Sequence, residues 1–212
     1  MSTIAKSSVI KNGAAGNNPA GGGSPPAPAA PFNKAILGML LFLSTEVMFF
    51  GGLISTFMIL RASSEAWPPP QQPLLPVAVT GLNTLLLLIS GLTMFRATKS
   101  IKTGNTKSLV RWLGMTAILG SVFLVFQGTE WFSLVRYGLT FSSSVYGGTF
   151  YALIGCHGLH VLGAVVCLLF VFRNSMKRKY TASAYTGVTL CSMYWYFVVG
   201  IWPVLYLLVY LN

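Results

Sequence analysis

Five long apolar runs dominate the sequence after residue 31, and the polar residues gather in the segments between them. The runs span 35–60, 74–95, 112–135, 145–172 and 185–211. Each exceeds the roughly 20 residues that an α-helix needs to cross about 30 Å of hydrocarbon. Backbone polar groups in lipid must be hydrogen-bonded internally, so the runs predict spanning helices. The predicted fold class is therefore all-α, a polytopic membrane protein with a bundle of five transmembrane helices over residues 32–212.

The first 31 residues have a different composition. They are rich in Gly, Pro, Ala, Ser and Asn and include the stretch GGGSPPAPAAP. Such a segment cannot bury a core, and it predicts a flexible Gly/Pro/Ala-rich N-terminal tail over residues 1–31. The tail also lacks the basic start and continuous apolar stretch of a signal peptide.

The distribution of charged residues along the chain predicts its orientation in the membrane. Only 8% of the residues are charged, against about 25% in a soluble domain, and the net charge is +11. The basic residues fall in the breaks between runs and form no patch with interleaved aromatics, so nucleic acid is not the predicted partner.

With the N-terminus inside, twelve of the fourteen lysines and arginines lie on the inner side, and only Arg61 and Arg136 lie outside. This positive-inside bias predicts an inner N-terminus and an outer C-terminus.

Four ionisable residues lie inside the apolar runs: Glu46, Glu130, His157 and His160. An ionisable group in a membrane is costly, so each is a candidate functional residue. Glu46 lies near the middle of its run, where two readings stay open: a protonated carboxyl that donates a hydrogen bond, or a proton-path or lipid-organising group. Glu130 lies nearer the outer end, and its predicted depth differs from that of His157 by roughly 10 Å. A shift of a few residues in the helix boundaries would bring the two together.

The two histidines are three positions apart and share a helix face. They could bind a metal, or they could hydrogen-bond across helices or to lipid head groups. Metal sites of this kind need three or four ligands, and the repeated Glu-x-x-His pattern of di-iron bundles is missing. The sequence also has no Gly-rich phosphate loop and no CxxCH haem-attachment motif. The prediction is therefore that this chain holds no metal and no redox cofactor.

The run that holds the histidines also carries small residues at helical spacing. Gly148, Ala152 and Cys156 recur every four positions, and Gly155 and Gly158 flank them. Small side chains let helices approach closely in lipid. The fourth helix is therefore predicted to be central to the bundle or to a subunit contact.

Ordered motifs give the chain a resemblance to a known family. TFYALIGCHGLHV at 149–161 is similar to the signature of subunit III of the haem–copper oxidases, the cytochrome c oxidase subunit III family. LSTEVMFFGG at 43–52 resembles that family's buried-glutamate motif, and QGTEWFSL at 127–134 resembles its Q-x-x-E-W/Y motif. WPPP at 67–70 occurs in bacterial members. The family's longer form has seven helices, and the five runs here resemble the shorter bacterial form.

The resemblance implies a non-redox subunit of a proton-pumping terminal oxidase that reduces O₂ to water in aerobic respiration. Haem and copper are then expected in partner subunits I and II, bound phospholipid in this one, and other respiratory complexes are further candidate partners. The implied location is the bacterial cytoplasmic (inner) membrane. Carried over by motif, Glu46, Glu130, His157 and His160 are the family's buried polar residues, with Glu46 first for proton uptake and lipid binding.

Other readings stay open at this point. The last run reads YWYFVVGIWPVLY, with Tyr196 and Val199 where many members have a His and an Asp, so the roles of those two polar residues do not carry over. A homologous subunit of a quinol oxidase, or one associated with nitric oxide reductase, has the same pattern. From a different class, a small independent transporter is possible, although no internal repeat or broken-helix pair marks a substrate site.

Overall fold

The computed structural model describes residues 33–69 and 77–211 and shows five helices in these ranges. The helices are α1 Lys34–Ala62, α2 Val77–Lys102, α3 Thr106–Arg136, α4 Val145–Met176 and α5 Thr186–Tyr210. All five are long and apolar enough to cross a membrane, and the described ranges contain no strand. The predicted all-α bundle of five spanning helices is therefore confirmed. The predicted tail, residues 1–31, lies outside the described residues, as does Pro70 of the WPPP motif.

Two helices extend beyond the apolar runs that predict them. α2 continues past residue 95 to Lys102, and α3 begins at Thr106 rather than near residue 112. Lysine and arginine have good helix propensity, and their long side chains can lay their stems on apolar surface while the charge reaches polar surroundings. An apolar run consequently ends before the helix does.

Local polar groups fix where helices begin and turn. The side chain of Asn33 accepts a hydrogen bond from the Ala35 N–H, Asn105 from the Ser108 N–H, and Ser144 from the Gly147 N–H. These caps satisfy backbone donors that the first turn leaves open. Gly104 (φ 74°) and Gly138 (φ 89°) follow the ends of α2 and α3 in the left-handed region that glycine adopts without strain.

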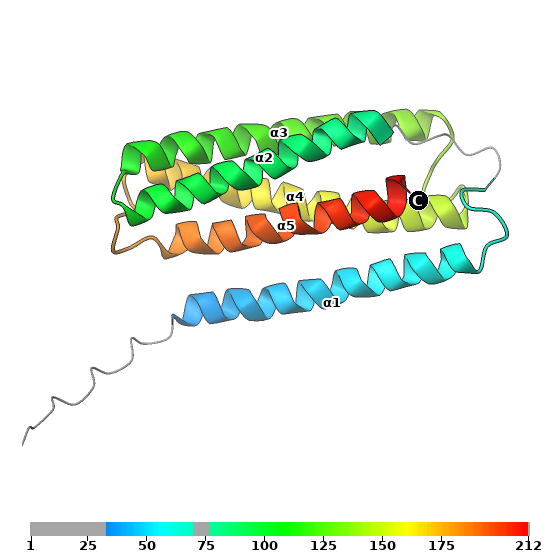
Figure 1. Cartoon of the computed structure of the whole chain (residues 1–212), viewed down its shortest axis with the longest axis horizontal. Coiled ribbons are helices and arrows are strands. Elements are labelled where there is room, and N and C mark those ends of the chain that lie inside the picture. Colours follow the sequence, from blue (N-terminus) through cyan, green and yellow to red (C-terminus); the bar gives the residue numbers. More distant parts are fainter. Residues whose placement is uncertain (1–32, 70–76, 212) are drawn as a thin grey trace, which may run out of the picture. The chain divides into compact units, whose positions relative to one another are not determined.

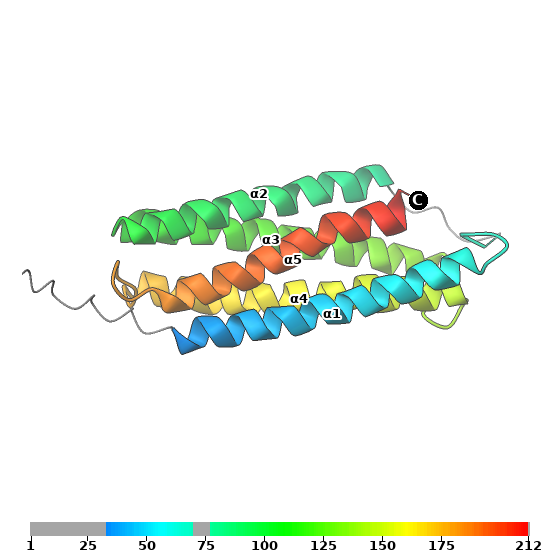
Figure 2. The same cartoon turned by 60° about the horizontal axis from the view of Figure 1, so that its bottom comes forward.

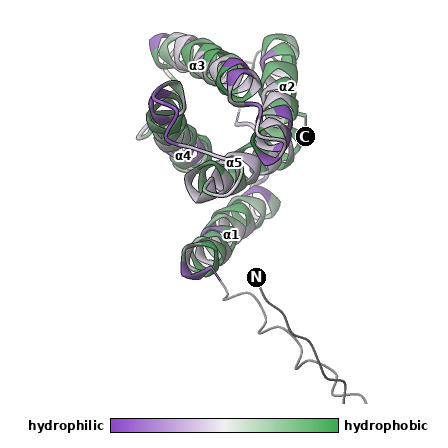
Figure 3. Cartoon of the chain, turned by 90° about the vertical axis from the view of Figure 1, so that its left-hand side faces the viewer, coloured by the Kyte–Doolittle hydropathy of each residue, from purple (hydrophilic) through white to green (hydrophobic). Residues whose placement is uncertain are grey.

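Helices α2–α5 form a four-helix ring, and α1 lies outside it. Neighbouring helices in the chain run antiparallel (Figures 1 and 2), and contacts between α2 and α5 close the ring. α1 contacts only α4 and α5 among the described helices, as the end-on view shows (Figure 3). The α2–α3 and α4–α5 connections and the start of α1 lie at one end, which carries most of the basic residues. Which side of the membrane this end faces stays a prediction.

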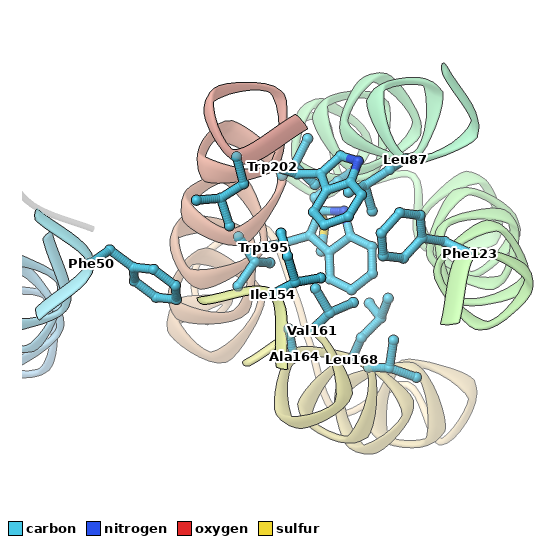
Figure 4. Close-up of a cluster of buried hydrophobic side chains, with 14 of the residues drawn as sticks. Phe50, Leu87, Phe123, Ile154, Val161, Ala164, Leu168, Trp195 and Trp202 are labelled. Carbon is cyan, nitrogen blue, oxygen red and sulfur yellow. The ribbon is translucent and has the colours of Figure 1, made fainter. Parts of the chain in front are cut away.

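Two tryptophans of α5 fill the centre of the ring. Trp195 and Trp202 are fully buried and point towards Phe123 of α3 and Leu87 of α2 (Figure 4). The Trp202 and Phe123 rings meet edge to face at 5.1 Å. Phe50 reaches from α1 towards the ring and is also buried. This packing holds α1, α4 and α5 in the positions that the polar groups described next require.

Candidate functional site

Glu46 on α1 and His160 on α4 form a hydrogen-bonded pair across two helices. Glu46 Oε2 lies 2.8 Å from His160 Nε2. The other ring nitrogen, Nδ1, lies 2.7 Å from the backbone oxygen of Cys156, one turn earlier on α4. The side chains are 17% and 19% exposed, so the pair lies at the border of the bundle rather than in its centre.

The two contacts of His160 determine how many protons the pair holds. A carbonyl oxygen only accepts hydrogen bonds, so Nδ1 carries a hydrogen and donates it to Cys156. Nε2 and Glu46 then share one proton between them. With that proton on nitrogen, the pair is an imidazolium and a carboxylate. With it on oxygen, both groups are neutral. The net charge of the pair is zero in both cases, which explains how two ionisable groups can lie among apolar helices.

Aromatic rings enclose the pair on the protein side. Phe50 meets the His160 ring edge to face at 5.0 Å, and Phe49 stacks on it at 6.1 Å. The Tyr194 hydroxyl donates to the His160 backbone oxygen at 3.4 Å. The two ring contacts and the hydrogen bond to Cys156 limit the rotation of the imidazole and keep Nε2 directed at α1.

Glu130 is the centre of a second polar group, which joins three helices. Its carboxylate oxygens lie 3.0 Å from the Thr80 hydroxyl of α2 and from Gln127 Nε2 one turn back on α3. Gln127 Nε2 also donates to the Tyr210 hydroxyl of α5 at 3.2 Å. Glu130 is 8% exposed. This site is more enclosed than the Glu46–His160 pair and ties the ring together at one end.

His157 takes no part in either polar group. It is 1% exposed, and its ring stacks on Trp202 at a centroid distance of 4.9 Å. Neither ring nitrogen has a hydrogen-bond partner in the described part of the chain. The hydrogen bonds of Glu130 go to Thr80 and Gln127, so the contact with His157 that the sequence left open is not formed. Phe50 of α1 contacts both histidine rings. However, only His160 hydrogen-bonds to α1, whereas His157 stacks on Trp202 of α5.

The predicted packing residues of α4 lie in different environments. A Cβ atom on Gly158 would lie 2.6 Å from the Trp131 ring of α3, so this glycine permits a close approach of α3 and α4. A Cβ atom on Gly148 would lie 3.2 Å from the backbone oxygen of Phe141, whereas one on Gly155 would meet nothing within 4 Å. Ala152 and Cys156 are half-buried. Cys156 contributes through its backbone oxygen, which orients His160.

Sequence reasoning missed the polar face of α2. Its buried hydroxyl and amide side chains hydrogen-bond to four other residues of α3 and α5 besides Glu130. Asn83 donates to the Phe123 backbone oxygen, Thr84 and Ser90 accept from the indole N–H groups of Trp202 and Trp195, and Thr93 pairs with Thr116. These side chains are three, four and seven positions apart, so they share one helix face. That spacing could have predicted a polar face on α2.

We expect Thr84→Val to lower the free energy of unfolding by about 1 kcal/mol, because the buried Trp202 N–H loses its acceptor while the side-chain shape is kept. The measurement is unfolding in mixed micelles of a mild detergent and SDS. Thr129→Val is the matched control, since the Thr129 hydroxyl is exposed and donates to the Phe126 backbone oxygen of its own helix. Equal losses in the two variants would contradict the role given to Thr84.

Metal binding was one of the readings left open for the histidines. Within residues 33–69 and 77–211, no group of three or more His, Cys, Asp or Glu residues is placed to hold a metal ion. Each of the two carboxylates inside the helices has polar side-chain partners instead, namely His160 for Glu46 and the Thr80–Gln127 pair for Glu130. The site is therefore a set of proton-bearing and hydrogen-bonding groups within a multi-pass membrane protein.

Comparison with known proteins identifies the family. A family model described as "Cytochrome c oxidase subunit III" matches residues 30–212. The chain is 36% identical to the cytochrome c oxidase subunit 3 of Synechocystis sp., over 83% of this chain and 75% of the relative. It is also 36% identical to that of Thermostichus vulcanus (83% and 86%) and 35% identical to the probable subunit of Mycobacterium leprae (84% and 88%). The chain belongs to the cytochrome c oxidase subunit III family, which confirms the resemblance drawn from its motifs.

Proposed function

We propose that this chain is the non-redox subunit III of a proton-pumping haem–copper terminal oxidase in a bacterial cytoplasmic membrane. In this role it stabilises the catalytic subunit I, holds phospholipid and supports proton uptake, while haem and copper reside in subunits I and II. Family membership and the relatives named as cytochrome c oxidase subunits support the proposal.

The Glu46–His160 pair is the observation that carries the proton-uptake part of this proposal. Its one shared proton can lie on nitrogen or oxygen without a change in net charge. The pair therefore stays neutral if it takes up one proton as it passes another on, so that no extra charge is held in an apolar setting. The partial exposure of both side chains leaves them within reach of lipid, water or an adjoining subunit.

The exposed face of α1 supports the structural part of the proposal. Leu41, Met48 and Ile59 are more than half exposed, although α1 is long and apolar enough to span the membrane. Among the described helices, only α4 and α5 cover α1. The remaining apolar surface is suited to lipid chains and to the flank of another membrane subunit.

We expect haem and copper to accompany the chain when it is purified under mild detergent with an affinity tag. A reduced-minus-oxidised optical spectrum should show haem bands in stoichiometric amount, and the haem type together with assays using cytochrome c or quinol should identify the electron donor. A colourless, self-associated protein would contradict the proposed function and favour an independent transporter.

A further inference from the structure

A cavity of about 280 Å³ lies between α3 and α4 and reaches the central tryptophan of α5. Its polar lining consists of Gln127, Trp131 and His157, and Trp202 forms part of its floor. At the rim lie Gly128 of α3 and Leu159 of α4, both exposed, the latter by 68%. Since both helices span the membrane, the mouth of the cavity faces lipid.

Three residues of the cavity lining carry buried polar atoms that lack partners. Gln127 Oε1, Trp131 Nε1 and both ring nitrogens of His157 are buried and have no hydrogen-bond partner among the described residues. Gln127 uses its Nε2 on Glu130 and Tyr210, which leaves Oε1 as a free acceptor. A neutral imidazole supplies one donor and one acceptor, and the indole supplies one donor. Buried polar groups are nearly always paired, so a partner from outside the chain is expected here.

Three kinds of content fit this lining poorly. A plain hydrocarbon would leave every one of these polar atoms unpaired. Water alone would need about nine molecules to fill the volume, and most of the wall is aromatic or aliphatic, which favours a dry cavity. A phosphodiester head group would bring a negative charge, and the cavity lining contains no lysine or arginine to offset its desolvation.

We propose that this cavity binds an uncharged single-chain amphiphile from the bilayer, a hydrocarbon chain that ends in one hydroxyl or one protonated carboxyl group. The polar end pairs with Gln127, Trp131 and His157, and the chain lies against the apolar wall and leaves between Gly128 and Leu159. The volume is nearly twice the roughly 150 Å³ of an apolar cavity that holds benzene, so part of a chain fits.

The depth of the site supports an uncharged head. Gln127 lies nine residues before the last residue of α3, about 13 Å along the helix. A head group bound there lies well below the membrane surface, where charge is costly and a neutral hydroxyl or acid is tolerated when hydrogen-bonded. This site is separate from the Glu46–His160 pair and does not depend on the proposed oxidase function.

The chain offers a way to block the cavity without disturbing the fold. Gly155 lines the cavity, and a Cβ atom added there meets nothing within 4 Å. Gly155→Leu therefore places a side chain in the space of the ligand. Gly200 of α5 also has open space around its Cβ position and is no part of the lining, so Gly200→Leu is the matched control. Trp131→Phe removes one donor and keeps an aromatic ring.

The test is photolabelling of the purified full chain, with the subunits that accompany it, by a decanol analogue carrying a diazirine at the far end of its chain. We expect labels on the α3 and α4 residues around the cavity and competition by plain decanol. Labelling should fall about tenfold in Gly155→Leu, which corresponds to roughly 1.4 kcal/mol, and stay unchanged in Gly200→Leu. In Trp131→Phe it should fall about fivefold, as for the loss of one hydrogen bond.

Matched probes decide the ligand class. A decane analogue without the hydroxyl should label the cavity weakly and respond little to Trp131→Phe. Labels spread evenly over the lipid-facing residues, or unchanged in Gly155→Leu, would overturn the proposal, as would equal competition by a phospholipid. Absence of any label in the cavity would also overturn it.

Discussion

An oxidase that carries Glu46→Gln is expected to assemble normally but to have an active lifetime about tenfold shorter, an effect of about 1.4 kcal/mol on the relevant barrier. Glutamine has the shape of glutamate, and its amide N–H can donate to His160 Nε2, because Nδ1 already carries the ring hydrogen that Cys156 accepts. The hydrogen bond between α1 and α4 is therefore kept. The movable proton is lost, since an amide does not exchange one with imidazole.

The measurement counts turnovers before inactivation, together with the turnover rate at alkaline pH, where proton supply limits the reaction. Glu65→Gln is the control, because it makes the same Glu-to-Gln replacement at an exposed position in the segment after α1. Normal assembly with a shortened lifetime in Glu46→Gln alone supports the proton role. Unchanged lifetime and turnover at high pH would leave Glu46 as a packing residue.

The partner of Glu46 could not be predicted from sequence. The carboxylate lies 114 positions from His160, and a hydrophobic run gives a helix but not its neighbours. The two histidines differ by about 60° around the α4 axis, which is enough to direct His160 to α1 and His157 to α5. Predicted depths, uncertain by a few residues, equally allowed a Glu130–His157 contact. The rotation of each helix, set by packing around Trp195 and Trp202, decides between these pairings.

The apolar runs predicted five spanning helices, and the structure confirms them. The motifs predicted the family, and the comparison with known proteins confirms it. The weaker part concerned α2, which the sequence presents as an uncharged apolar run. Thr80 and Thr84 of that run hydrogen-bond to Glu130 and Trp202, so α2 supplies polar contacts to the ring. Hydroxyl groups change the mean hydropathy of a run very little. The polar face of α2 is therefore found from the helical spacing of its polar residues and not from the mean hydropathy.

Gly120→Ala is expected to cost about 1–3 kcal/mol of unfolding free energy, because the helix has no room for a methyl group there. An added Cβ atom would overlap the six-membered ring of Trp195 and lie 3.3 Å from Val165 Cγ2. The Trp195 ring cannot move away cheaply. It is fully buried, and its Nε1 donates to the Ser90 hydroxyl at 3.2 Å.

Gly128→Ala on the same helix provides the matched comparison, since its Cβ position meets nothing within 4 Å. There we expect no loss and a gain of up to about 1 kcal/mol, because only helix propensity is altered and alanine is the better helix former. SDS titration in mixed micelles measures both variants. A comparable loss of unfolding free energy in both variants would show that α3 needs glycine for its own helical structure and not for its contact with Trp195. A loss confined to Gly120→Ala means that the contact of α3 with the α5 tryptophan sets the width of the ring, and with it the positions of α4 and the histidines.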